Sequence, residues 1–534
     1  MLNQKLEVLN DFWLNQSEIH LLRLFKIEDE FFWGSIKLDA TPKEALIFDI
    51  RIPLSYPLSN DSMSIRFYCK NVEGYRHINN DQSLCLIVPK NFKIKDRLVD
   101  EVKLLKEWRD KYYIKEEKDE KYDYLIVTPK NNNTFLFTDI NANFKKGESG
   151  QFTGLHISKN NFLDMPDSSL YYIQSIGKYK CKWSNLLSIQ KPDLDGFYYF
   201  IEQEPLDKKG KNVENWIEFD KFFNQQFKEQ LYELKVNSKF PAAEVFLLIG
   251  YNIPDSEEIH WQMAKLDRRG IPVAAKRVTP KYYEYNFINQ EINWSKTFNS
   301  SYSRFFGRGA IHEDIANSKI LVVGAGAVGS SLAKILVRAG AKNISFCDND
   351  LIEPGNLCRS EYFITKVTYP KCLALFQQLH LISPFVNLGI EPEISKILER
   401  LYIEKEKARL EKYDYIFDCT SDVELAYVLD HLRLESLIFN ISISNEAKEL
   451  VCVIGNKNVY VKKEQLFKKL GYGEASLYYE GTGCWSPTFK ASFFDINSLV
   501  NQAVKKINLQ YIKRKSFNSF VLKNENDNLL SFDY

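Results

Sequence analysis

The sequence predicts an α/β protein of three domains, with a doubly wound parallel sheet in its C-terminal part. Three observations support this prediction. The chain has 534 residues, too many for one hydrophobic core. From about residue 302, apolar strand-like runs alternate with helix-like segments, the order typical of a doubly wound sheet. Before that point, short strand-like runs lie between polar turns. The domain boundaries that we predict are 1–123, 124–300 and 301–534.

The first domain is predicted to be α+β, with a helix followed by an antiparallel meander. Apolar residues recur at helical spacing within 1–25, which predicts an amphipathic opening helix. Strand-like runs follow at 31–38, 45–53 and 62–69. The charged run at 113–123 predicts the end of this domain.

The central region is predicted to be a mixed α/β linker domain. Short apolar strands alternate there with polar turns, and the run at 242–254 is one such strand. The region contains no catalytic constellation. We therefore expect it to space the two flanking domains.

Composition and charge exclude several classes of protein. The 71 Lys and Arg residues nearly balance the 70 Asp and Glu residues, which gives no support for nucleic-acid binding. The first residues do not resemble a secretory signal, and no run of about twenty apolar residues occurs. We therefore expect a soluble, cytoplasmic protein with no membrane partner. The nine cysteines include no CxxC pair, which argues against a zinc ribbon or a disulfide framework and leaves reactive thiols as candidates.

The most informative segment contains a glycine loop between a strand and a helix. The motif GAGAVG places glycine at Gly324, Gly326 and Gly329. Such glycines allow a tight turn and let the phosphates of a nucleotide reach the N-terminus of the following helix. Taken alone, this pattern would predict a dinucleotide-dependent dehydrogenase.

The residues after the second strand favour a different chemistry. The segment from Asp348 reads D-N-D-x-I-E-x-x-N-L-x-R and includes Asn356 and Arg359. A dehydrogenase has no need for a cation so close to the phosphates, whereas an enzyme that transfers AMP from ATP to a carboxylate does. An ordinary NAD-binding unit would leave this tail and the helix-borne Lys371 unexplained.

Over about residues 302–500, these motifs resemble the family of ubiquitin-activating and ThiF/MoeB-type adenylating enzymes. The resemblance implies a Rossmann-like adenylation domain that uses ATP and Mg²⁺. It implies that Asp348 holds the ribose hydroxyls, and that Asn356, Arg359 and Lys371 surround the phosphates and stabilise the charge that develops as pyrophosphate leaves.

The same resemblance implies a homodimer and a metal ligand. Arg304 matches an arginine that in this family reaches across a dimer interface to the neighbouring ATP, and Arg308 is a second candidate for that role. The family usually has its magnesium-binding aspartate directly after D-C-T. In this chain Ser421 stands there and Asp422 follows. Asp422 is therefore the metal candidate, with a helix N-cap as its alternative role.

Cys484 is the candidate nucleophile that would capture the adenylated carboxyl group as a thioester. It lies in the run EGTGCWSPTF, a glycine-flanked loop of the kind that is partly exposed, and thiolates are strong nucleophiles. The run resembles the corresponding segment in prokaryotic fusions of activating and conjugating domains. The alternative is a packed loop cysteine. Cys347, Cys419 and Cys452 lie in apolar runs and are expected to be buried and inert.

The first domain contains a second candidate thiol. The segments SYPLS and HINNDQSLCLIV resemble a ubiquitin-conjugating fold, which implies that Cys85 accepts the acyl group from Cys484. Asn79 would then stabilise the oxyanion, and His77 would brace the loop. Two departures leave alternatives open, because Ile78 replaces the proline of the family and Asn79 lies closer to Cys85 than usual. Asn79 could be a simple turn residue, and Cys85 a buried strand cysteine.

As a whole, the resemblance implies a bacterial activating–conjugating fusion of the kind found in CBASS anti-phage operons. Such an enzyme would adenylate the C-terminus of a cGAS-like nucleotidyltransferase and join it to the lysine of a target protein. One alternative is a related enzyme for a dedicated ubiquitin-like modifier. Others are a MoeB/ThiF-like adenylyltransferase for a sulfur carrier, and a catalytically silent scaffold that binds the C-terminal tail of a partner.

Overall fold

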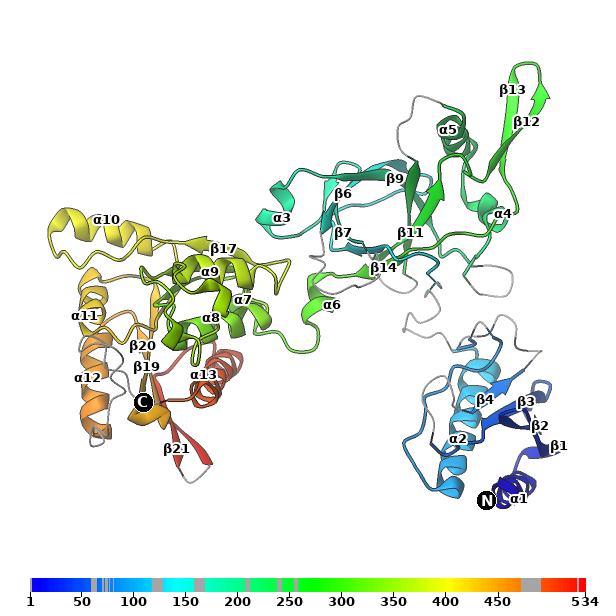
Figure 1. The fold of residues 1–534 in the computed structure, drawn as a ribbon, viewed down its shortest axis with the longest axis horizontal. Coiled ribbons are helices and arrows are strands. Elements are labelled where there is room, and N and C mark those ends of the chain that lie inside the picture. Colours follow the sequence, from blue (N-terminus) through cyan, green and yellow to red (C-terminus); the bar gives the residue numbers. More distant parts are fainter. Residues whose placement is uncertain are drawn as a thin grey trace. The chain divides into compact units, whose positions relative to one another are not determined.

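Figure 1 shows the computed structural model of the chain as a ribbon. Its residues group into two compact units. Unit 1 comprises residues 1–136, 142–178 and 193–298, and unit 2 comprises residues 137–141, 179–192 and 299–534. Among the residues that the structure describes, no helix is long and apolar enough to cross a membrane. The described residues are 2–58, 65–69, 72, 75, 77–79, 81–117, 127, 129–157, 169–206, 212–237, 243–253, 258–471, 491–525 and 528–534.

The N-terminal part of unit 1 packs helices against one antiparallel sheet. Helix α1 (Leu2–Leu14) precedes the strands β1 (Ile19–Glu28), β2 (Phe31–Leu38), β3 (Leu46–Pro53) and β4 (Arg66–Tyr68), which pair in that order. Helix α2 (Ile94–Trp108) continues into a π-helical turn at Arg109–Ile114. Trp13, Phe32, Phe48 and Leu98 are fully or almost fully buried between these layers. The strands predicted at 31–38 and 45–53 are confirmed.

The predicted opening helix is only half right. It ends at Leu14, and the second half of the predicted segment forms β1 instead. The chain reverses between them at Glu18, where φ is +63°. Pairing with β2 then satisfies the backbone of β1, and Ile19 and Phe25 enter the core.

The central part of unit 1 contains a larger mixed sheet. Its strands follow the order β11-β10-β9-β6-β7-β5-β14, and a core rich in aromatic residues includes Trp216 and Trp294. The elements are β5 (Thr134–Phe137), β6 (Ser149–Ile157), β7 (Leu170–Ile176), β9 (Leu194–Glu202), α4 (Trp216–Phe219), α5 (Gln225–Val236), β10 (Glu244–Asn252), β11 (Ile259–Asp267) and β14 (Lys296–Asn299).

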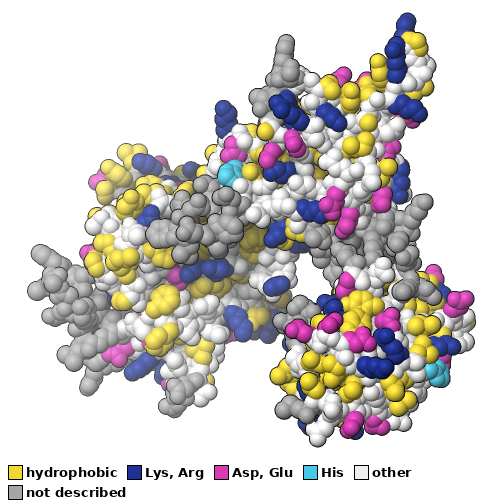
Figure 2. Space-filling model, turned by 45° about the vertical axis from the view of Figure 1, so that its right-hand side comes forward, with side chains coloured by type: hydrophobic (Ala, Val, Ile, Leu, Met, Phe, Trp, Pro, Cys, Tyr) yellow, Lys and Arg dark blue, Asp and Glu magenta, His cyan; other side chains and the backbone are white. Residues whose placement is uncertain are grey.

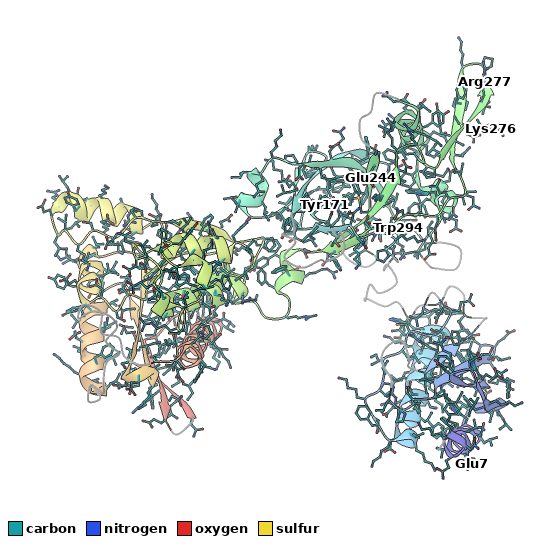
Figure 3. The ribbon with its side chains drawn as sticks, viewed as in Figure 1. Glu7, Tyr171, Glu244, Lys276, Arg277 and Trp294 are labelled. Carbon is teal, nitrogen blue, oxygen red and sulfur yellow. The ribbon has the colours of Figure 1, made fainter. Side chains whose placement is uncertain are left out.

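A separate hairpin extends from this central part. Strands β12 (Val273–Thr279) and β13 (Tyr282–Phe287) pair only with each other among the described strands. Lys276 and Arg277 are exposed near the hairpin tip, where Figure 3 shows them pointing away from the strands. Figure 2 shows Lys and Arg side chains gathered at the end of a projection of the surface. Phe287 at the other end of β13 is buried and anchors the hairpin to the core.

Unit 2 is built on an eight-stranded sheet in the order β17-β16-β15-β18-β19-β20-β21-β22. The first five strands are parallel and the last three are antiparallel. This order of the parallel strands confirms the predicted doubly wound sheet. The strands are β15 (Lys319–Val323), β16 (Asn343–Cys347), β17 (Asn387–Ile390), β18 (Tyr415–Asp418), β19 (Leu437–Ser444), β20 (Glu449–Gly455), β21 (Phe520–Glu525) and β22 (Asn528–Asp533).

Helices cover both faces of this sheet and create two cores. On one face Leu332, Leu375 and Val500 pack together, and on the other Leu425 and Leu466 do so. The first face carries α7 (Glu313–Asn317), α8 (Ala327–Arg338), α9 (Lys371–Leu379) and α13 (Phe493–Arg514), and the second carries α10 (Arg400–Leu410), α11 (Val423–Leu432) and α12 (Val459–Leu470).

A short segment from the middle of the chain also belongs to unit 2. It comprises β8 (Tyr179–Lys180) and α3 (Asn185–Ile189). The Ser184 N–H donates to the carbonyl of Pro384 at 2.8 Å, and the rings of Trp183 and Phe385 lie 5.5 Å apart. Phe385 also contacts helix α6 (Tyr302–Phe306), which is the helix that carries Arg304.

Candidate active site

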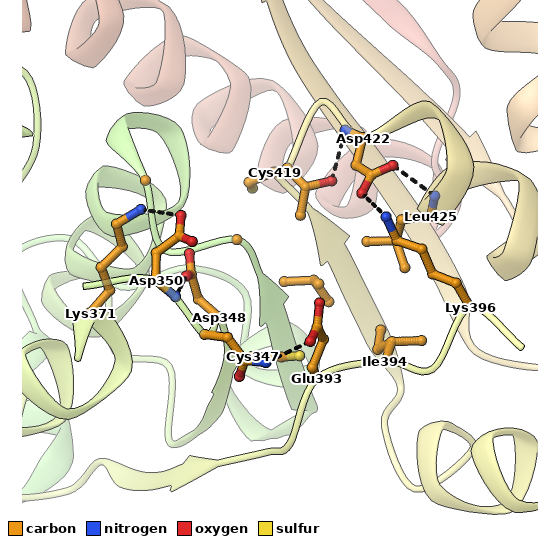
Figure 4. Close-up of a pocket in the computed structure, with 15 residues that line it drawn as sticks. Cys347, Asp348, Asp350, Lys371, Glu393, Ile394, Lys396, Cys419, Asp422 and Leu425 are labelled. Atoms are coloured by element: carbon orange, nitrogen blue, oxygen red, sulfur yellow. Dashed lines mark hydrogen bonds and ion pairs between the residues drawn. The ribbon is translucent and has the colours of Figure 1, made fainter. Parts of the chain in front are cut away.

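A cavity of about 350 Å³ lies at the carboxyl ends of β15, β16 and β18 (Figure 4). In an open α/β sheet this edge is where ligands bind, beside the strand at which the direction of winding reverses. Polar side chains and the glycine loop supply most of its wall. The lining residues are Val323, Gly324, Gly326, Cys347, Asp348, Asn349, Asp350, Lys371, Glu393, Ile394, Lys396, Cys419, Thr420, Asp422 and Leu425.

The three motif glycines have three different surroundings. Gly324 has a φ of +84°, which favours glycine. A Cβ on Gly329 would lie 1.8 Å from the carbonyl oxygen of Gly324, so only glycine lets α8 approach the turn this closely. A Cβ on Gly326 would meet no atom within 4 Å, and no side chain caps the helix there. The open space at Gly326 and the uncapped start of α8 fit a phosphate group.

Asp348 ties the glycine loop to the end of β16. One carboxylate oxygen accepts a hydrogen bond from the Ala325 N–H at 2.6 Å, and the other accepts from the Asp350 N–H at 2.8 Å. Each carboxylate oxygen can accept a second bond, so both remain able to accept from ribose hydroxyls. The Lys371 side chain is largely buried, and its ammonium donates to Asp350 at 2.7 Å. Lys371 therefore brings a positive charge to the cavity wall.

Asp422 is the N-cap of α11. One of its oxygens accepts from the Leu425 N–H at 3.1 Å, and the other accepts from the Lys396 ammonium at 2.5 Å. Burial works to raise the pKa of Asp422, but Lys396 and the helix N–H groups lower it below its ordinary value. The preceding Ser421 has a φ of +59°, and this left-handed turn directs the chain into the helix. Asp422 is thus an ionised carboxylate at the cavity, and capping does not exclude metal binding.

The remaining predicted nucleotide residues do not line the cavity. Asn356 ends a short turn that begins at Pro354, and its side-chain oxygen accepts from the Glu353 N–H at 2.9 Å. Arg359 is half-buried, and within the described part of the chain its guanidinium makes no hydrogen bond or ion pair. Arg304 and Arg308 are exposed.

Among the polar residues of the cavity, sequence reasoning missed Glu393 and Lys396. Glu393 accepts a hydrogen bond from the Asn349 side chain at 2.6 Å, and Lys396 forms ion pairs with Asp422 and Glu424. Glu393 and Lys396 follow β17 in a stretch that matches no motif. Their one available signal was their position after a strand of the parallel sheet, since such loops form the ligand edge.

The residues around Cys85 form a small hairpin. The Cys85 N–H donates to the His77 carbonyl at 2.7 Å, and the Asn79 side chain donates to the Ser83 hydroxyl and the Leu84 carbonyl at 3.0 and 3.1 Å. The Cys85 side chain is exposed. The ring of His77 lies 4.6 Å from that of Tyr112. Both amide hydrogens of Asn79 thus have acceptors inside the hairpin that presents the Cys85 thiol.

Cys358 is exposed like Cys85, and the remaining described cysteines are buried or half-buried. Cys347 and Cys452 are buried as expected, whereas Cys419 is half-exposed. Burial raises the pKa of Cys347 to about 11 and that of Cys372 to about 12. These two thiols are therefore protonated and unreactive at neutral pH. Cys484 lies outside the described residues.

A magnesium site made of protein ligands alone is not found in the part of the chain that the structure describes. No group of three or more His, Cys, Asp or Glu side chains there could hold a metal ion. Mg²⁺ in nucleotide enzymes usually takes one or two carboxylates and completes its shell with phosphates and water. Asp422 fits that pattern, because its ionised side chain lies on the cavity wall.

Comparisons with known proteins agree with this geometry. Residues 299–444 match the ThiF family. The chain is 28% identical over 281 residues to the ATP-dependent ubiquitin transferase-like protein Cap2 of Enterobacter hormaechei subsp. hoffmannii, covering 48% of this chain and 45% of Cap2. It is 32% identical over 136 residues to the adenylyltransferase and sulfurtransferase UBA4 of Vanderwaltozyma polyspora, covering 25% and 30%. The chain thus spans less than half the length of these relatives.

Solved structures of an Escherichia coli protein also match. MccB with ATP is 14% identical, with a TM-score of 0.30 and coverage of 42% of this chain and 64% of MccB. The microcin C7 biosynthetic enzyme MccB with N-formylated MccA is 15% identical, with a TM-score of 0.31 and coverage of 42% and 65%. The family match and the curated relatives support a ThiF-type, E1-like adenylation domain in the C-terminal part of the chain. The ubiquitin-conjugating-like first domain stays a prediction.

Proposed function

We propose that this chain is an ATP-dependent enzyme that adenylates the C-terminal carboxylate of a protein and conjugates it to an amine through thioesters. The observation that carries the proposal is the cavity, in which an open glycine loop, Asp348 and Lys371 lie together. The exposed Cys85 thiol supports the conjugating half of the proposal.

The first reaction would form an acyl adenylate. A carboxylate oxygen of the donor attacks the α-phosphorus of ATP, and pyrophosphate leaves with the bonding electrons. The N–H groups that open α8 would bind phosphate oxygens, and Lys371 would stabilise the negative charge that develops on them. Arg359 would add a second cation once the nucleotide is bound. Mg²⁺, held by Asp422 and phosphates, would supply further charge neutralisation.

The second and third reactions would move the acyl group between sulfurs. The Cys484 thiolate attacks the acyl carbonyl and AMP leaves, which forms a thioester. The Cys85 thiolate then attacks that thioester, and the Cys484 thiolate leaves. Finally a lysine amine of the target attacks the carbonyl, and an amide forms as Cys85 is released. Asn79 would need to release one of its hairpin acceptors to stabilise the oxyanion, so its first role is to brace the hairpin.

We propose a homodimer in which each ATP site receives an arginine from the partner. Arg304 and Arg308 are exposed and do not line the cavity of their own chain. A residue that acts in the ATP site of the partner must be accessible in this way. Tyr302 orients the helix of Arg304, because its hydroxyl donates to the Gly340 carbonyl at 2.6 Å.

The proposed donor is a cGAS-like nucleotidyltransferase of a CBASS system, as the resemblance to activating–conjugating fusions implies. The similarity to the ATP-dependent ubiquitin transferase-like protein Cap2 supports the transfer chemistry. A dedicated ubiquitin-like modifier would suit the same chemistry, because the cavity recognises a carboxylate and not the protein that carries it. The target is a protein with an accessible lysine.

A second candidate function is adenylation of a sulfur carrier without conjugation. The similarity to UBA4, an adenylyltransferase and sulfurtransferase, supports this candidate. That match covers about a quarter of the chain. Such an enzyme would catalyse ATP–pyrophosphate exchange with its donor but would have no use for Cys85.

The test is incubation with ATP, magnesium and each candidate donor, read on gels with and without a thiol reductant. We expect a reductant-sensitive adduct that accumulates on Cys484 in Cys85→Ala and is absent in Cys484→Ala. Cys358→Ala is the matched control, since Cys358 is also an exposed thiol. An adduct that survives Cys484→Ala but disappears with Cys85→Ala would reverse the proposed order. Pyrophosphate exchange without any adduct would favour the second candidate.

A further inference from the structure

Lys463 is a charged residue in the interior of unit 2. It lies on the buried face of α12 between Val459 and Leu466, and only 5% of its surface is exposed. Within the described part of the chain, its ammonium has no hydrogen-bond partner. Burying an unpaired charge is costly, and a methionine or leucine would fill this position without that cost.

Three carboxylates act on the Lys463 charge. They are Asp418, at the end of β18, the neighbouring Glu464 of α12, and Asp422. Burial lowers the pKa of Lys463, and these carboxylates oppose that effect. Asp418 is fully buried and accepts three hydrogen bonds, from the Thr420 N–H at 3.1 Å, the Thr420 hydroxyl at 2.6 Å and the Asn440 amide at 2.6 Å. Burial raises the pKa of Asp418, and the hydrogen bonds from Thr420 and Asn440 together with the Lys463 charge oppose that rise by favouring the carboxylate form.

Asp418 in turn shapes the wall of the cavity. The Thr420 hydroxyl that donates to Asp418 accepts a hydrogen bond from the Asp422 N–H at 3.0 Å. Ser421 between them holds a left-handed conformation, with φ of +59°. The loop from Asp418 to Asp422 is therefore fixed by one continuous set of bonds, and Thr420 and Asp422 line the cavity (Figure 4).

We propose that Lys463 is a positioning residue of the nucleotide site. Its buried charge compensates Asp418, and Asp418 through Thr420 holds Asp422 at the cavity. Lys463 itself does not line the cavity and touches no reacting atom. The inference rests on the proposed function, because it assigns Lys463 to the binding of ATP and magnesium.

The test compares Lys463→Met with Lys462→Met in the full chain. Lys462 is the neighbouring residue of α12 and is exposed, so it controls for the loss of a lysine. ATP binding is measured by calorimetry at fixed magnesium, pyrophosphate exchange gives KM and kcat, and thermal melting reports folding. We expect Lys463→Met to fold but to melt lower than the wild type, because Asp418 loses its compensating charge, and to raise both the Kd and the KM for ATP about tenfold. Lys462→Met should change neither constant.

Two further variants separate a positioning role from a packing role. Lys463→Arg keeps the charge and should keep the KM within about threefold. Thr420→Val breaks the link between Asp418 and Asp422 while Lys463 remains, and should raise the KM as Lys463→Met does. An unchanged KM in Lys463→Met overturns the inference, and if that variant fails to fold, an unchanged KM in Thr420→Val does so. Failure of the wild type to bind ATP would refute the proposed function instead.

Discussion

Two alanine substitutions in the glycine loop should change different properties. Gly326→Ala should weaken ATP binding, and Gly329→Ala should lower the stability of the fold. At Gly326 a methyl group meets no protein atom within 4 Å, and the backbone, with φ of −74°, accepts an L-residue. The stability of Gly326→Ala should therefore stay within about 1 kcal/mol of the wild type. The methyl group would occupy the space through which a phosphate reaches the N–H groups of α8. Losing one charge-assisted hydrogen bond costs about 1.5–3 kcal/mol, or about a 10- to 150-fold rise in Kd for ATP.

At Gly329 the methyl group collides with the protein itself. Its carbon would lie 1.8 Å from the Gly324 oxygen, where a carbon needs about 3.3 Å, so the helix and the turn must separate by about 1.5 Å. Overpacking of this kind costs about 1–3 kcal/mol or more, so Gly329→Ala should melt several degrees lower. Calorimetric titration with ATP and thermal melting of both variants give the two readings. A Gly326→Ala variant that binds ATP like the wild type would refute our placement of the phosphates.

Three further predictions concern thiols, a buried acid and the metal candidate. Alkylation of the native protein should modify the exposed Cys85 and Cys358 but not Cys372, whose pKa burial raises to about 12, as peptide mass spectrometry would show. Burial raises the pKa of Glu101 to about 7. The folded state therefore holds this proton more tightly than the unfolded chain does. Stability is then lost as the pH rises from about 4.5 through 7. Glu101→Gln should remove that loss of about 3 kcal/mol, measured as hydrogen-exchange protection of α2 at pH 8. Asp422→Asn keeps the N-cap acceptor but not the charge, so stability should hold while half-maximal exchange needs about tenfold more magnesium.

Each of these predictions has a control and a contradicting outcome. Denatured protein should label at every cysteine, and native labelling of Cys372 would contradict the burial argument. For Glu101 the control is pH 4, below both pKa values, where the acid is mostly protonated in both states and the variant should nearly match the wild type. A difference that is constant from pH 4 to pH 8 would mean that titration plays no part. An unchanged magnesium requirement in Asp422→Asn would move the metal site elsewhere.

Strands and helices with a regular pattern of apolar residues could be predicted from the sequence. A strand whose pairing with its neighbour is irregular could not. Strand β3 has buried residues at every second position, so its alternation is visible in the sequence. Strand β1 has register shifts between Leu21 and Arg23 and between Arg23 and Lys26. These irregularities break the period of two, and most of the strand is exposed, so its sequence resembles the helix before it.

The site shows the same division. The glycine loop, Asp348 and Lys371 belong to local motifs, and the structure brings them to one cavity. Glu393 and Lys463 reach the site or its support only through tertiary folding, from the loop after β17 and from α12. Their separation from the glycine loop along the sequence does not indicate that they lie near it in the fold.

The path of the chain limits how this protein can be taken apart. A fragment that begins at residue 301 looks like a natural C-terminal module, yet it would discard residues 137–141 and 179–192, which belong to the same compact body. Phe385 would lose its neighbour Trp183, and the Tyr302 N–H would lose the Asp139 carboxylate that accepts its hydrogen bond at 3.2 Å. Weak activity of such a fragment would then result from lost contacts of the helix that carries Arg304. Removal of residues 1–123 preserves that body and is the sounder way to separate activation from conjugation.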